Sequence, residues 1–229
     1  MKTDLVQYLK DRYAERNIPG TDPGPVVTIA RETGCTGKKV AQQLMDSLNK
    51  RFPAQTKIEP WKWVGKEIFV EASKELGIDP LVVRNIFEEK RGIIDEFLSS
   101  QSQKYYKNDR TVIKTISEII RSMANHGHVI ILGRGGVPLS RDIPKSLHIY
   151  LEAPIEWRIN VISEKYCFSL SEARKYVEET DARRIHYREH FEGKGNDYTW
   201  VDVKYNSMQL KPAEIVESII HLMEIKNLL

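Results

Sequence analysis

Residues 26–48 combine a buried strand, a glycine-containing loop and an amphipathic helix, and this succession constrains the fold more than any other feature. Val26–Ala30 is a short apolar, β-branched run, which is typical of a strand buried on both faces. Helical spacing then relates Val40, Ala41, Leu44, Met45 and Leu48. The loop between them reads Thr-Gly-Cys-Thr-Gly-Lys over 33–38, and its glycines allow backbone N–H groups to converge before the positive end of the helix. Such a loop predicts an anion site, most often for phosphate.

The loop matches only part of the phosphate-binding motif G-x-x-x-x-G-K-[ST]. Gly37 and Lys38 fit its central pair. Glu32 stands where the motif has its first glycine, and Lys39 stands where it has the hydroxyl residue that binds Mg²⁺. Two interpretations stay open: a phosphate site built from the loop amides, which we favour, and a strand–turn–helix junction whose glycines serve only the turn.

Apolar runs alternate with helical patterns along the rest of the chain. Strands are predicted at 128–132, 146–151 and 201–205, with a further short strand at 56–59. Helices are predicted from 112 to 126, after Pro154, after the capping box Ser169–Glu172 and from Pro212, while 61–108 reads as helical and polar. This alternation predicts a three-layer α/β fold with a parallel five-stranded sheet, whose ligands bind beyond the carboxyl ends of the strands.

The length of 229 residues suits one domain with insertions or two small domains. We interpret 1–24 as an N-terminal helix with a Pro/Gly connector, and 25–229 as the domain that carries the function. A net charge of +3 is too small to argue for nucleic acid. Cys35 and Cys167 form neither a disulfide framework nor a metal-binding spacing. With no signal peptide and no apolar run of membrane length, we expect a cytoplasmic protein that does not contact a membrane. The oligomeric state is not indicated.

Several arginines occupy positions that suit phosphate binding. Arg134 lies between glycines directly after an apolar strand, where its planar fork can hold a phosphate in two places. Asp181, Arg184 and Arg188 share one helix face through their i, i+3, i+7 spacing, and Lys194 follows between two glycines. An arginine-bearing helix end followed by such a segment is what a closing lid requires. The alternative for both sets is a charged surface that faces solvent.

The sequence resembles the cytidylate kinase-like family, a divergent branch of the P-loop nucleoside monophosphate kinases. The resemblance runs from about residue 26 to the end and is carried by Thr28–Lys38, Val129–Gly135, Ala153 and Pro154 with Arg158, Asp181 with Arg184 and Tyr187, and Tyr205–Ser207. It implies a P-loop NTPase fold with a helical acceptor-binding insertion over 57–108 and a lid over about 181–200.

The resemblance also implies a kinase that uses ATP and Mg²⁺ to phosphorylate a nucleoside monophosphate, with CMP or dCMP favoured. The expected phosphate-binding residues of the loop are Thr33, Gly34, Cys35, Thr36, Gly37, Lys38 and Lys39. The expected catalytic residues are Lys38, Arg158, Arg184 and Arg188, and the expected acceptor-binding residues are Arg134 and Asp181. Candidate oxygen ligands for Mg²⁺ within the loop are Thr33, Thr36 and Glu32.

The chain departs from authentic cytidylate kinases beyond the first glycine and the hydroxyl of the loop motif. Gly135 stands where an aspartate is usual, and Val177 stands where their lid carries an arginine. The missing hydroxyl is the main argument for the alternative function, a non-catalytic regulatory protein that binds nucleotide through a degenerate P-loop.

Cys35 lies within the same loop. Lys38, Lys39 and the helix N-terminus beside it favour a thiolate. We therefore expect Cys35 to be the more reactive of the two cysteines, and to be protected when nucleotide is bound.

Overall fold

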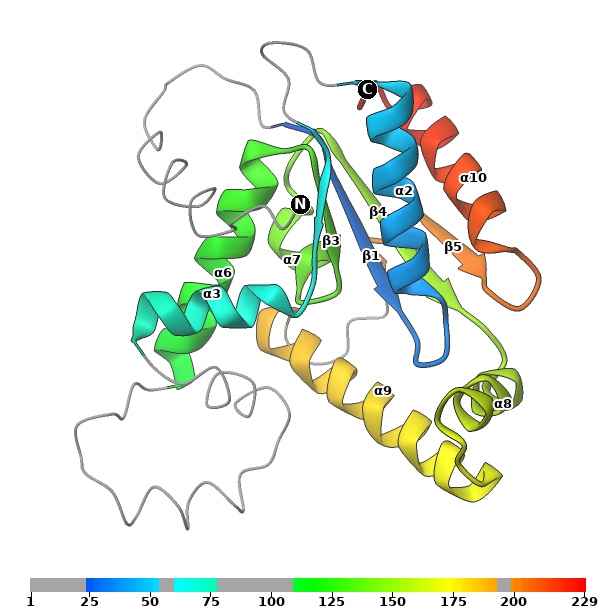
Figure 1. Ribbon diagram of the computed structural model, residues 1–229. Coiled ribbons are helices and arrows are strands. Elements are labelled where there is room, and N and C mark those ends of the chain that lie inside the picture. Colours follow the sequence, from blue (N-terminus) through cyan, green and yellow to red (C-terminus); the bar gives the residue numbers. More distant parts are fainter. Residues whose placement is uncertain (1–23, 54–59, 78–108, 193–198) are drawn as a thin grey trace, which may run out of the picture.

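The protein is described by a computed structural model that covers residues 24–53, 60–77, 109–192 and 199–229. Within these ranges, five parallel strands form one sheet in the order β2-β3-β1-β4-β5 (Figure 1). Their bounds are β1 Val26–Arg31, β2 Lys62–Val64, β3 Val129–Leu132, β4 Ser146–Glu152 and β5 Val203–Asn206. The predicted parallel five-stranded sheet is therefore confirmed.

Helices cover both faces of this sheet and complete a three-layer fold (Figure 1). Their bounds are α2 Gly37–Arg51, α3 Glu67–Leu76, α6 Asp109–His126, α7 Gly136–Ser140, α8 Ile155–Tyr166, α9 Leu170–Glu192 and α10 Pro212–Ile225. Helices α2 and α10 pack together on one face, whereas α6 and α7 lie on the other. Helices α8 and α9 pack against each other beyond the carboxyl ends of the strands (Figure 1). None of the helices described here is long and apolar enough to cross a membrane.

The central strand β1 is buried on both faces, as its composition predicts. Val27 and Ile29 pack with Leu44 of α2 in one apolar cluster, while Val26 packs with Ile116 of α6 in the other. Because both faces of β1 are covered, its carboxyl end is held firmly where the glycine loop begins.

One edge of the sheet differs from the sequence prediction. The predicted strand 56–59 lies outside the described residues, and the observed edge strand β2 lies within the segment predicted to be helical. Lys62 donates its N–H to the carbonyl oxygen of His128 at 3.0 Å, and Val64 is paired with Ile131. Three residues are too few for a periodic pattern, so pairing with β3 determines this strand. The five-residue helix α7 was also not predicted.

Some predictions concern residues that the structure does not describe. These are the N-terminal helix and nearly all of the connector in 1–24, the 78–108 part of the insertion, and the part of the lid at 193–198 that contains Lys194. The capping box is observed, because Ser169 and Glu172 exchange hydrogen bonds at the start of α9.

Candidate phosphate-binding site

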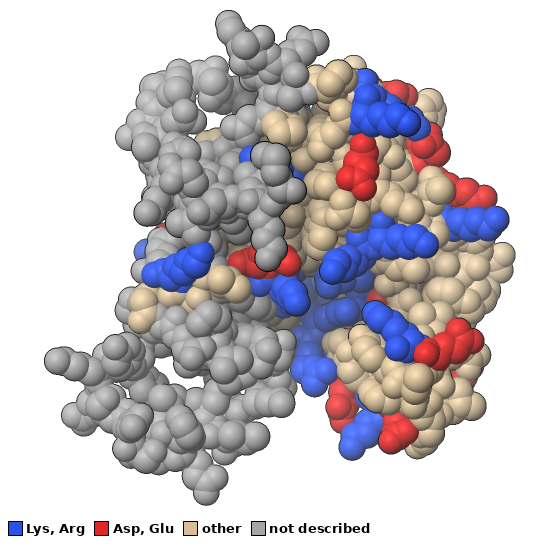
Figure 2. All heavy atoms as spheres, viewed as in Figure 1, with Lys and Arg blue, Asp and Glu red and all other residues tan. Residues whose placement is uncertain are grey.

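A cavity of about 480 Å³ lies at the carboxyl ends of β1 and β3, between the sheet, α7 and α9. Five arginines from three parts of the fold line it, namely Arg31 at the end of β1, Arg134 after β3, and Arg183, Arg184 and Arg188 on α9. No described aspartate or glutamate is part of this lining. Figure 2 shows Lys and Arg side chains gathered in a hollow near the centre of this face. The cavity is therefore suited to an anion with several oxygens, such as phosphate.

The backbone of the loop after β3 is strained where it presents Arg134. Arg134 has a φ of 59°, between Gly133 at 72° and Gly135 at 71°. This left-handed conformation costs a non-glycine residue on the order of 1–3 kcal/mol and is concentrated at functional sites. At Gly135, a Cβ would lie 2.8 Å from the ring of Phe191, so the close packing there also requires glycine. The structure places Arg134 in the cavity, where the sequence predicted a phosphate contact.

Aromatic side chains form the remaining wall of the cavity. Tyr176 and Tyr187 of α9 line it together with Trp200. The guanidinium carbon of Arg134 lies 5.9 Å from the ring centroid of Tyr187. Burial raises the pKa of Tyr187, so its phenol stays protonated at neutral pH. This wall offers neutral, planar surface to a ligand whose anionic part is bound by the arginines.

Arg184 connects α9 to the end of β1. Its Nη1 donates to the carbonyl oxygen of Arg31 at 3.2 Å and lies 3.5 Å from Oδ1 of Asp181. Burial lowers the pKa of Arg184, and the Asp181 carboxylate acts in the opposite direction. Of the three residues predicted to share one helix face, Arg184 and Arg188 line the cavity and Asp181 does not.

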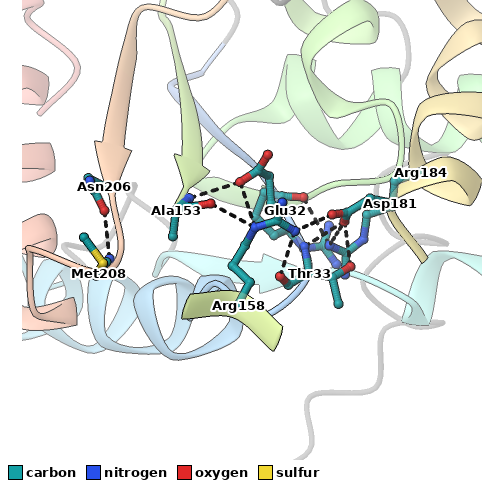
Figure 3. A network of polar contacts seen from close by, with 9 residues as sticks. Glu32, Thr33, Ala153, Arg158, Asp181, Arg184, Asn206 and Met208 are labelled. Carbon is teal, nitrogen blue, oxygen red and sulfur yellow. Dashed lines mark hydrogen bonds and ion pairs between the residues drawn. The ribbon is translucent and has the colours of Figure 1, made fainter. Parts of the chain in front are cut away.

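The side chain of Arg158 lies in a buried network rather than in the cavity (Figure 3). It is 8% exposed, and its Nε donates to the carbonyl oxygen of Ala153 at 2.9 Å and lies 3.2 Å from Oε2 of Glu32. Its Nη1 pairs with Oδ2 of Asp181 at 2.5 Å and donates to the carbonyl oxygen of Thr33 at 3.3 Å. The sequence placed Arg158 on the transferring phosphoryl group, but the structure does not bring it together with the arginines of the cavity.

Asp181 fastens α9 to the glycine loop (Figure 3). One of its oxygens accepts both the backbone N–H of Thr33 at 2.8 Å and the Thr33 hydroxyl at 2.6 Å. The other oxygen pairs with Arg158. The structure thus places Asp181 on the loop and outside the lining of the cavity, while its expected contact with the acceptor stays a prediction.

Within the loop itself, several backbone amides already have acceptors. Glu32 donates to Leu151, Thr33 donates to Asp181, and Cys35 donates to the carbonyl oxygen of Glu32. The first-turn amides at 37–39 of α2 stay available to a ligand, because helical geometry gives them no intrahelical acceptor. Gly34 has a φ of 95°, and a Cβ there would lie 3.0 Å from that of Arg158.

The two lysines of the loop lie outside the cavity. Lys38 and Lys39 are exposed, and Nζ of Lys38 lies 5.9 Å from the ring centroid of Trp63. The ammonium groups and the first-turn amides can therefore be reached by a ligand on the outer side of the loop, separate from the arginine cavity.

The prediction of a reactive thiolate at Cys35 is corrected by its surroundings. Burial raises the pKa of the Cys35 thiol to about 11, and this outweighs the hydrogen bond to Ser207, which lowers it. The nearby carboxylates of Glu32 and Asp181 raise the pKa further, against the opposing charge of Arg158. The thiol of Cys35 is thus protonated at neutral pH, chiefly because it is buried.

The three candidate ligands for Mg²⁺ differ in what their oxygens already bind. Glu32 accepts from the N–H of Ala153 and pairs with Arg158, while the hydroxyl of Thr33 donates to Asp181. The hydroxyl of Thr36 is buried, has no hydrogen-bond partner and does not cap α2. No group of three or more metal-binding side chains occurs among the described residues. Thr36 is therefore the residue that fits a Mg²⁺ ligand, with water and phosphate oxygens as the others.

Two arginines of the cavity were missed by reasoning from the sequence. Arg31 lies in the stretch that carries the family resemblance but was assigned no role, and Arg183 was not singled out. The signal for Arg31 was its position directly after a strand buried on both faces, since strand ends lead into ligand sites. Arg183 had no such signal.

Comparison with known proteins indicates the family and the fold of the chain. The model of the cytidylate kinase-like family matches residues 26–206, whereas no curated protein matches the chain. An uncharacterized protein from Eubacterium ventriosum ATCC 27560 has a similar structure, with a TM-score of 0.60, 18% identity and coverage of 87% of this chain and 98% of that chain. A shikimate kinase from Acinetobacter baumannii, solved in complex with shikimate, gives a TM-score of 0.47, 12% identity and coverage of 91% and 97%.

The segment that matches the family model contains all five strands, the glycine loop and the five arginines of the cavity. The structure of the Eubacterium ventriosum protein adds a likeness of fold alone, since its sequence identity is low. On the family match, which confirms the resemblance seen in the sequence, the chain belongs to the cytidylate kinase-like family.

Proposed function

We propose that the protein transfers a phosphoryl group from ATP to a nucleoside monophosphate, with CMP or dCMP as the first acceptors to test. Membership of a cytidylate kinase-like family supports a nucleotide kinase-type function. The observation that carries the proposal is the cavity with five arginines and no carboxylate in its described lining. Phosphoryl transfer requires little else from a protein than cations and donors placed around the transferring group.

The roles of the residues follow from where they lie. Arg134 would bind the acceptor phosphate, while Arg184 and Arg188 would contact the transferring phosphoryl group. The first-turn amides of α2 and Lys38 would bind the donor phosphates, because the flexible lysine stem lets its ammonium leave Trp63. An oxygen of the acceptor phosphate would form a bond to the γ-phosphorus as the bond from that phosphorus to the β,γ-bridging oxygen breaks, which releases ADP.

Arg158 and Asp181 are assigned here as positioning residues. Arg158 ties the loop to α8 through Glu32 and Thr33, and Asp181 ties the same loop to α9. These contacts set the distance between the loop, where the donor would bind, and the cavity arginines on α9. They also make α9 the element whose movement would open or close the site.

The aromatic wall is the place where the base of the acceptor would lie. Tyr176, Tyr187 and Trp200 offer ring surfaces beside the arginines. The choice of CMP and dCMP comes from the family to which the chain belongs.

Mg²⁺ would accompany ATP, and Thr36 is the loop residue that fits as its ligand. Its buried hydroxyl has no partner, and it stands at the start of the helix that follows the loop. When bound, Mg²⁺ would neutralise part of the phosphate charge.

The test is a coupled assay for diphosphate with CMP, dCMP, UMP and AMP, together with calorimetry of monophosphate binding. We expect Mg²⁺-dependent turnover with at least one pyrimidine monophosphate. Arg134→Ala should weaken monophosphate binding by about 1.5–3 kcal/mol, because it removes a charge-assisted pair without opening a core cavity. Arg174→Ala is the matched control, since Arg174 lies on α9 but pairs with Glu156 at the surface. Turnover no higher than that of heat-killed protein, for all four acceptors, would contradict the proposal.

A second candidate is a non-catalytic protein that binds nucleotide and regulates a partner. It is favoured by the contact in which Asp181 occupies the amide of Thr33, since a phosphate reaching that amide must displace a carboxylate. Stabilisation of the protein by ATP in a thermal-shift measurement, without any diphosphate in the coupled assay, would support this candidate.

A further inference from the structure

The side chain of Arg31 occupies a channel formed by two glycines. A Cβ on Gly37 would lie 3.2 Å from Cγ of Arg31 and 3.4 Å from its Cδ. A Cβ on Gly133 would overlap Nη1 of the same guanidinium. Gly37 is the first residue of α2 and Gly133 directly follows β3, so both elements leave the space through which Arg31 reaches the cavity. The two glycines therefore have a role beyond their turns.

The positive charge of Arg31 is not balanced by a nearby carboxylate in the described part of the chain, as the charge of a structural arginine would be. No ion pair or side-chain hydrogen bond joins its guanidinium to another described residue, whereas Arg158 has two carboxylates. Burial lowers the pKa of Arg31 to about 9, and the neighbouring charges of Arg184 and Arg134 lower it further, with only a partial offset from Asp181. Arg31 thus lies near two like charges with no carboxylate of the described residues bound to its own guanidinium, which is unfavourable until an anion binds.

We propose that Arg31 is a phosphate-binding residue, which holds one phosphoryl group in the cavity together with Arg134. The assignment of that group to a substrate rests on the proposed function, but binding of phosphate by these residues does not. Arg184 is held by the backbone oxygen of Arg31 at 3.2 Å, so replacing the Arg31 side chain leaves this contact in place. The side chain of Arg31 can therefore be tested apart from the position of α9.

The experiment compares wild type, Arg31→Met, Arg31→Lys and the control Arg174→Met at constant ionic strength. Binding of inorganic phosphate and of pyrophosphate is measured by calorimetry at 20 °C, and the melting temperature is measured with and without phosphate. We expect Arg31→Met to weaken binding of either anion at least tenfold and to abolish the rise in melting temperature that phosphate causes. Without phosphate, its melting temperature should equal or exceed that of wild type, because a buried, unbalanced charge is gone.

Arg31→Lys keeps the charge but loses the planar fork of the guanidinium, so we expect a loss of phosphate affinity between those of wild type and Arg31→Met. If Arg31→Met does not fold, Arg31→Lys becomes the deciding variant. The control should bind phosphate as wild type does. Phosphate affinity within threefold of wild type in the deciding variant, or no binding to wild type, would overturn the proposal. No ATP or nucleotide is present, so a failed kinase assay leaves this result standing. Conversely, suppose that wild type turns over substrate while the Arg31 variants bind phosphate as wild type does. That result would contradict the role of Arg31 and leave the proposed function standing.

Discussion

At the scale of single residues, burial by itself does not separate a structural arginine from a binding one. Arg158 is buried and Arg31 is half-buried, but Arg158 is balanced by Glu32 and Asp181, whereas Arg31 faces two further arginines. A buried charge needs a partner, and the identity of that partner indicates the role. For Arg158 the partner is part of the fold; for Arg31 we infer that it is a ligand.

Thr36 allows a test at the same scale. Thr36→Val removes a buried hydroxyl that has no hydrogen-bond partner and replaces it with a methyl group of similar size. We expect the free energy of unfolding to rise by about 1 kcal/mol, because an unsatisfied buried polar group is lost. Urea denaturation in the absence of nucleotide measures this change, and a lower stability would show that the hydroxyl is satisfied in the folded protein. If Thr36 is also the Mg²⁺ ligand, the variant should bind ATP with less dependence on Mg²⁺ than wild type.

At the scale of elements, helix α9 joins the glycine loop to the arginine cavity. Asp181 holds Thr33 of the loop, and three residues later Arg184 holds the carbonyl oxygen of Arg31 and lines the cavity. One helical turn thus contacts both places where phosphates are proposed to bind. A shift of α9 would alter both at once, which is the geometry expected of a lid.

The network around Arg158 predicts a loss of stability rather than of phosphate affinity. Arg158→Met should lower the free energy of unfolding by about 3 kcal/mol, the low end for a broken buried pair, because it leaves two partly exposed carboxylates without a cation. Denaturant unfolding of this variant is compared with Arg174→Met, which breaks a surface pair and should change stability by less than about 1 kcal/mol. Equal effects in the two variants would mean that the network does not hold the loop.

At the scale of the whole molecule, a polar contact joins two neighbouring strands inside the apolar sheet. Nδ1 of His148 on β4 lies 2.8 Å from the hydroxyl of Thr28 on β1, and the ring is 4% exposed. Burial lowers the pKa of His148 to about 4, with Lys226 acting in the same direction and Asp202 against it. The imidazole is therefore neutral inside the fold at pH 7.

This neutral imidazole makes the fold sensitive to acid. In the unfolded chain His148 takes up a proton near pH 6.5, whereas in the folded protein it does so only near pH 4. The unfolded state binds more protons between these values, so stability should fall as the pH drops from 6.5 to 4, by about 3 kcal/mol from this group. Urea unfolding at pH 7, 5.5 and 4 should show a smaller loss for His148→Gln than for wild type. Parallel losses would place the acid sensitivity in other groups.

Local pattern was enough to predict most of the architecture. The apolar run Val26–Ala30, the helical spacing after Val40 and the capping box at Ser169 each depend on neighbours a few residues away, and each is observed. The strand β2 was missed for the opposite reason, since three residues carry no period and owe their form to pairing with β3.

The site was predictable where a local signal marks it and not where the partner is remote. Arg134 was found because two glycines flank it at the end of a strand, and Arg184 and Arg188 because they share a helix face. The contacts that Asp181 makes with Arg158 and Thr33 were not predicted, because these partners lie far away in the sequence.

Sequence determined the succession of strands and helices, the parallel sheet and the edge at which the arginines gather, because hydrophobic periodicity and strand ends are local properties of a chain. Tertiary structure alone decided which charged and polar groups form ion pairs and hydrogen bonds with one another. Glu32 reaches Ala153 across 121 residues, and Thr33 reaches Asp181 across 148. Electrostatic interactions depend on distance in space and on burial, and the folded chain sets both when it brings such residues together.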